Sequence, residues 1–131
     1  MAEPGAVLTA FTKPELHDLA DGLLVDDPAA VEACVHFLLM ETRGFWHNRA
    51  RAVMSRRLKH CSLTPAQRSD LLACILRRLR DGNFTEQFDD QLRLALNLDR
   101  NAVVASVERI ADKATKDHVR RFAAWVLRNH A

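Results

Sequence analysis

Residues 43–60 hold the densest group of side chains in the sequence that could bind an anion. At about 100° per residue, a helix over this stretch places Arg49, Arg56 and His60 on one face. Guanidinium groups bind carboxylates and phosphates through paired hydrogen bonds, and an indole ring stacks on planar groups. The sequence therefore predicts a basic binding patch on this helix. Its candidate residues are Trp46, His47, Arg49, Arg51, Arg56 and His60.

A second polar stretch follows at residues 83–94. Glu86 and Asp90 are four residues apart and share a helix face, where like charges repel as they do in the carboxylate pairs of general acid–base sites. Ordinary pairing within the helix is also available, because Asp89 and Arg93 have the same spacing. The candidate residues of this acidic and polar face are Glu86, Gln87 and Asp90.

The basic and the acidic stretch also have a purely structural interpretation. If their two helices lie side by side, ion pairs between the carboxylates of one and the guanidinium groups of the other account for both charge runs without any ligand. The sequence leaves this alternative open.

No motif of an enzyme or a metal site stands out. The sequence has no HExxH, no ExxH pair and no Cys/His cluster at zinc spacing, and it lacks GxSxG, a glycine-rich phosphate loop and a dinucleotide fingerprint. We therefore expect no metal, no cofactor and no catalytic residue. An enzyme acting on small molecules stays the third hypothesis, and it would need a pocket lined by groups such as His47, Glu86 and Asp90.

The three cysteines, Cys34, Cys61 and Cys74, lack CxxC spacing, and each lies in an apolar stretch. We expect buried, reduced thiols in a cytoplasmic protein. The amino terminus lacks the basic start and apolar core of a secretory signal. The most apolar run, Ala33–Met40, falls far short of the roughly 20 residues that a membrane span needs, so we expect no membrane segment.

The chain has 131 residues, of which 48% are hydrophobic and 27% charged, so it is expected to fold as one globular domain over residues 1–131. The charge is uneven: residues 1–42 carry a surplus of seven acidic groups, residues 43–80 a surplus of nine basic groups, and residues 81–131 no surplus. The net charge of only +2 argues against strong nonspecific binding to DNA.

Helical periodicity runs through almost the whole chain, and no strand is expected. Three segments share one apolar stripe, and each follows a residue suited to cap a helix: Asp27, Thr64 and Asp99, which are 37 and 35 residues apart. A second helix is predicted after each segment, over residues 45–60, 86–96 and 118–130, with caps at Thr85 and Thr115 for the last two. A shorter helix over residues 14–24 is expected to cover the open end.

These features predict an all-α fold: a right-handed stack of antiparallel helix pairs with about seven helices, residues 1–26 as a cap and residues 27–131 as three pairs. A compact helical bundle is the alternative. Leu94 and Val104 are expected to be exposed, which leaves room for a dimer face.

A two-helix unit recurring every 35–37 residues resembles the HEAT-like and armadillo-like class of helical repeat proteins over residues 27–131. The resemblance implies a rigid, curved surface that holds a protein or peptide. It also allows nucleic-acid binding, because some HEAT-like proteins bind DNA through a concave basic surface. We therefore expect a non-catalytic binding or scaffold module that presents its basic patch to an acidic protein partner, with a nucleic-acid-binding or nucleic-acid-processing protein as the alternative.

Overall fold

The computed structural model describes residues 12–42, 44–84 and 86–130, which form seven α-helices, two short 3₁₀ helices and no strand. This confirms the prediction of an all-α chain with about seven helices. In chain order the elements are α2 (Lys13–Gly22), η1 (Leu23–Val25), α3 (Pro28–Leu39), α4 (Phe45–Leu58), α5 (Pro65–Asp81), η2 (Glu86–Phe88), α6 (Asp89–Leu98), α7 (Arg100–Lys113) and α8 (Asp117–His130).

The caps expected for the first helix of each pair are confirmed. The side chains of Asp27, Thr64 and Asp99 each accept a hydrogen bond from the backbone N–H three residues further on. Each cap satisfies one of the N–H groups that a helix start leaves without a partner. Asp27 and Thr64 are followed by a proline, which has no N–H to satisfy at the first helical position.

The caps expected for the last two second helices, Thr85 and Thr115, are not confirmed. Thr85 lies outside the described residues. The cap at Thr115 is wrong by one residue, because α8 begins at Asp117 and its first backbone bond runs from the Arg120 N–H to the Lys116 carbonyl.

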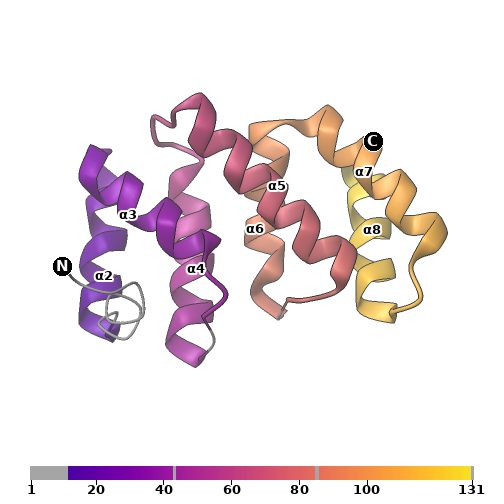
Figure 1. Cartoon of the computed structure of the whole chain (residues 1–131), viewed down its shortest axis with the longest axis horizontal. Coiled ribbons are helices and arrows are strands. Elements are labelled where there is room, and N and C mark those ends of the chain that lie inside the picture. The colour runs from indigo at the N-terminus through magenta and orange to yellow at the C-terminus, as the bar shows by residue number, and fades with distance from the viewer. Residues whose placement is uncertain (1–11, 43, 85, 131) are drawn as a thin grey trace.

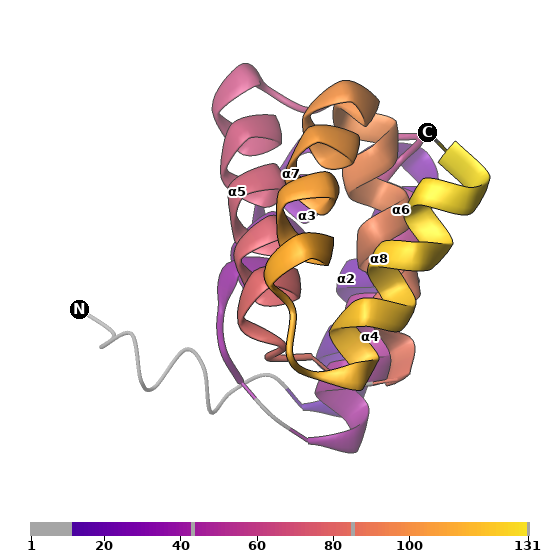
Figure 2. The same cartoon turned by 90° about the vertical axis from the view of Figure 1, so that its right-hand side faces the viewer.

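The helices form two layers, with α2, α4, α6 and α8 in one and α3, α5 and α7 in the other (Figures 1 and 2). Helices within a layer run in the same direction, opposite to those of the other layer, so consecutive helices are antiparallel. The chain is therefore a short two-layer stack, in which α2 lies at one end against α3 and α4.

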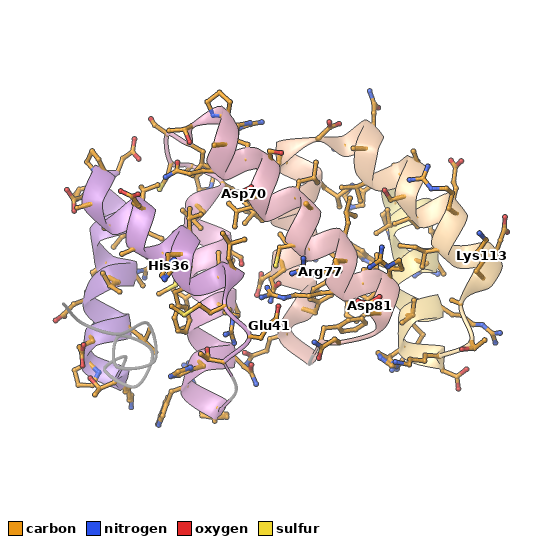
Figure 3. All side chains as sticks on the ribbon, in the orientation of Figure 1. His36, Glu41, Asp70, Arg77, Asp81 and Lys113 are labelled. Atoms are coloured by element: carbon orange, nitrogen blue, oxygen red, sulfur yellow. The ribbon has the colours of Figure 1, made fainter. Side chains whose placement is uncertain are left out.

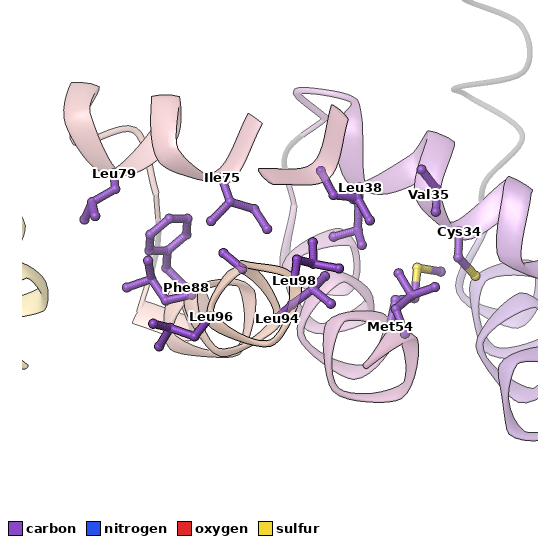
Figure 4. Close-up of a cluster of buried hydrophobic side chains, with 14 of the residues drawn as sticks. Cys34, Val35, Leu38, Met54, Ile75, Leu79, Phe88, Leu94, Leu96 and Leu98 are labelled. Atoms are coloured by element: carbon purple, nitrogen blue, oxygen red, sulfur yellow. The ribbon is translucent and has the colours of Figure 1, made fainter. Parts of the chain in front are cut away.

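The core lies between the two layers, where side chains of α3 and α5 meet those of α4 and α6 (Figure 4). The buried residues include Leu38, Ile75, Leu79, Met54, Phe88, Leu94 and Leu98. The expectation that Leu94 is exposed is wrong. It is fully buried because α6 has neighbours on several sides (α4, α5 and α7) and so buries two of its faces.

Helices α2 and α3 approach so closely at Gly22 that the position has no room for a side chain. A Cβ atom built on Gly22 would lie 2.5 Å from the Cβ of Ala30. We expect Gly22→Ala to lower the free energy of unfolding by about 1–3 kcal/mol, although alanine favours helices more than glycine does. Urea unfolding measures this change. The double variant with Ala30→Gly should recover most of the loss, and a single variant as stable as the wild type would contradict the close approach.

Candidate functional site

The structure separates the residues of the predicted basic patch instead of gathering them on one surface. Trp46 and Arg49 line a groove between α2 and α4, and His60 is exposed just after the end of α4. Arg51 is buried on the opposite side of the helix, because it shares the inward-facing stripe of Met54 and Leu58. The expectation that Arg51 belongs to an open patch is therefore wrong.

His47 points into the protein interior instead of the groove. Its Nδ1 lies 2.8 Å from the hydroxyl oxygen of Thr42, and its ring packs edge-on against Phe37. These contacts hold the start of α4 against the end of α3.

The groove between α2 and α4, which we call the α2–α4 groove, has a volume of about 410 Å³. Trp46, which lines the groove, is 44% exposed, and Phe45, the residue before it, is 67% exposed. The Nζ of Lys13 lies 3.8 Å from the centroid of the Trp46 ring, a cation–π contact. Apolar side chains from both helices form the floor: Leu16 and Ala20 from α2, and Ala50 and Val53 from α4.

The charges around the α2–α4 groove differ in their pairing. Arg57 and His17 both contact the carboxylate of Asp21, at 3.2 and 3.3 Å. Within the part of the chain that the structure describes, no carboxylate lies within ion-pair distance of Lys13 or Arg49. These two cations are therefore available to an incoming acidic group.

The predicted acidic and polar face provides one partner for the basic helix. The Nη1 of Arg56 lies 2.8 Å from a carboxylate oxygen of Asp90, which joins α4 to α6. For this pair, the structural interpretation of the two charge runs is confirmed. Gln87 is exposed on η2, while the side chain of Glu86 lies outside what the structure describes.

A second tryptophan lies in a groove between α6 and α8, with a volume of about 610 Å³. The guanidinium of Arg93 lies 5.3 Å from the ring centroid of Trp125. Arg121 and Arg128 also line this groove. The layer formed by α2, α4, α6 and α8 thus carries two tryptophan–cation pairs.

The sequence did not predict that two arginines form a buried cluster. Arg51 and Arg78 are each only 5% exposed, and both donate to the carbonyl of Met40, just after the end of α3. Arg78 also donates to the carbonyl of Leu38 at 2.7 Å and to the side-chain oxygen of Gln91 at 3.0 Å. The signal was present in the sequence, because Arg78 continues the buried stripe of Leu71 and Ile75.

Glu41 is the only carboxylate near this cluster among the described residues. One of its oxygens lies 3.1 Å from Arg78 and 3.9 Å from Arg77, beside which it appears in Figure 3. Burial, reinforced by the charge of Arg78, lowers the pKa of Arg51 to about 10. This value is still far above neutral pH, so the guanidinium of Arg51 carries a charge.

None of the three cysteines forms a disulfide. Cys34 and Cys74 are buried as expected, but the expectation of a buried thiol is wrong for Cys61, which is half-buried. Burial raises the pKa of all three thiols and brings that of Cys34 to about 12. A thiol with a raised pKa is a poor nucleophile at neutral pH. The described residues contain no cluster of three potential metal ligands. None of their helices combines the length and apolar character needed to cross a bilayer.

No family model, no curated protein and no solved structure matches this chain.

Proposed function

We propose that this chain is a non-catalytic binding module, resembling short HEAT-like or armadillo-like stacks, that holds an acidic segment of a partner protein in the α2–α4 groove. The observation that carries the proposal is the exposed Trp46 beside two cations, Lys13 and Arg49, that have no acidic partner among the described residues. Aromatic residues and arginine are the residue types most enriched at the centres of protein interfaces.

The lining of the α2–α4 groove favours a peptide over a nucleic acid. Its floor of leucine, alanine and valine can bury an apolar side chain of a peptide, while Lys13 and Arg49 at the rim can pair with carboxylates that flank this side chain. A phosphate backbone would make no use of an apolar floor. We therefore expect the preferred ligand to be a peptide with one large apolar residue flanked by aspartate or glutamate.

Selection from a random peptide library, followed by titration of the selected peptides, tests this proposal. Replacing Trp125 by phenylalanine leaves Trp46 as the only tryptophan, so its emission reports occupancy of the α2–α4 groove. The selected peptides should combine an apolar residue with acidic neighbours. Arg49→Glu should weaken their binding at least tenfold. Trp46→Ala, whose binding is followed by the anisotropy of a dye-labelled peptide because no tryptophan remains, should weaken it by a similar factor, because both residues lie in the proposed contact.

Arg109→Glu is the matched control, because Arg109 is an exposed arginine on α7, in the opposite layer. It should bind the peptides as the wild type does. Peptides without acidic residues, or equal binding by the Arg49→Glu variant, would contradict the proposal.

Nucleic-acid binding is the second candidate, and the two tryptophan–cation pairs on one layer favour it. It predicts a salt-dependent mobility shift of single-stranded DNA or RNA that weakens when Trp46 or Trp125 is replaced by alanine. The absence of a shift at low salt would exclude it.

A further inference from the structure

The two buried arginines line a cavity of about 140 Å³ between α4, α5, α6 and the segment after α3. We call it the arginine cavity. It is separate from the α2–α4 groove and shares no residue with it. The polar side chains that line it are Glu41, Thr42, Asn48, Arg51, Arg78, Asn83 and Gln91.

The charges around the arginine cavity do not balance. Two guanidinium groups, each 5% exposed, face one carboxylate, and the side chain of Glu41 is 54% exposed. The carbonyl end of α3 contributes the equivalent of about half a negative charge. Part of one positive charge is thus left without compensation in a buried place, where an unpaired charge is strongly destabilising.

The hydrogen-bonding groups show a matching surplus of donors. The Nε of Arg51 is buried and has no acceptor. The side-chain oxygens of Asn48 and Gln91 already accept from Arg51 and Arg78, so their NH₂ groups are left to donate. Within the described residues, the cavity therefore offers the Nε–H of Arg51 and the NH₂ groups of Asn48 and Gln91 to a further acceptor.

We propose that the arginine cavity binds a small oxyanion, either a phosphate group or a carboxylate. Such an anion supplies both missing quantities, a negative charge and several acceptor oxygens. Arginine is the residue best suited to it, because its planar fork matches both groups.

Thermal unfolding in sodium phosphate and in sodium acetate, each against sodium chloride at equal ionic strength, tests this proposal. At ten times its Kd the bound anion should raise the wild-type Tm by about 5 °C, and the rise should saturate. A rise in phosphate alone identifies a phosphate-binding cavity, and a rise in acetate alone identifies a carboxylate-binding one. No saturable rise in either salt overturns the proposal.

Two variants locate the effect. Arg51→Met removes the charge at similar length and should abolish the response. Asn48→Asp places a carboxylate beside Arg51, so it should raise the Tm without added anion and also abolish the response. The Asn48→Asp variant therefore tests anion binding in the arginine cavity even if Arg51→Met does not fold.

Arg49→Met is the matched control, because Arg49 lies on the same helix but faces the α2–α4 groove. It should keep the full response. A response that persists in Asn48→Asp or Arg51→Met would show adventitious ions on the surface and would overturn the proposal.

Discussion

Replacing Arg78 by methionine is expected to lower the free energy of unfolding by about 3–5 kcal/mol, one of the largest effects of any substitution in this chain. Arg78 is buried and donates to the carbonyls of Leu38 and Met40, to Glu41 and to Gln91. Methionine fills most of the same volume, so the loss comes from polar groups left without a donor at the end of α3.

Urea unfolding of the Arg78→Met variant measures this loss. Arg77→Met is the matched control, because Arg77 is the adjacent residue, is exposed and reaches Glu41 only at 3.9 Å. It should change the free energy of unfolding by less than about 1 kcal/mol. Similar small changes in both variants would show that Arg78 does not stabilise the end of α3.

The parts of the fold that could be predicted from the sequence are those that depend on local interactions. Asp27, Thr64 and Asp99 bond to backbone three residues away, so each helix start is encoded within a few residues. The apolar stripes depend on the helical period alone. The caps and stripes together predicted the number of helices and the order of the pairs.

The arginine cavity could not be predicted in the same way, because its contacts join distant parts of the chain. Arg78 bonds to backbone carbonyls 38 and 40 residues earlier, and a carbonyl leaves no signature in a sequence. The charge of Arg51 suggested an exposed surface, yet its position on the stripe of Met54 and Leu58 places it inside. For these two arginines, the helical period predicts burial more reliably than the residue type does.

The α2–α4 groove is an intermediate case. The helical period places Trp46 on the same side of α4 as Ala50 and Val53, which pack against the core. Whether the indole is covered depends on how far α2 extends, and α2 leaves it partly exposed. The sequence could therefore identify Trp46 and Arg49 as candidates but not the groove that joins them.

The second large effect is expected at alkaline pH, where the buried thiol of Cys34 should destabilise the fold. Cys34 is fully buried and donates to the carbonyl of Leu19 at 3.5 Å. Burial is the main cause that raises its pKa from 9.0 to about 12, with a smaller contribution from the charge of Cys61, against the opposing charge of Arg57. The folded chain therefore keeps this proton over a range of pH in which the unfolded chain loses it.

Between pH 9 and pH 12 the folded state binds more protons than the unfolded state, so the free energy of unfolding falls as the pH rises. The slope from this one group is about 1.4 kcal/mol per pH unit.

Urea unfolding under reducing conditions at pH 7.5, 9.0 and 10.5 measures this slope. Between pH 9.0 and 10.5 the wild type should lose about 2 kcal/mol more than the Cys34→Ala variant, which has no thiol to titrate at this position. The comparison isolates Cys34, because Cys61, Cys74 and the lysines titrate in both proteins. Parallel losses in the two proteins would mean that the Cys34 thiol is not enclosed between α2 and α3.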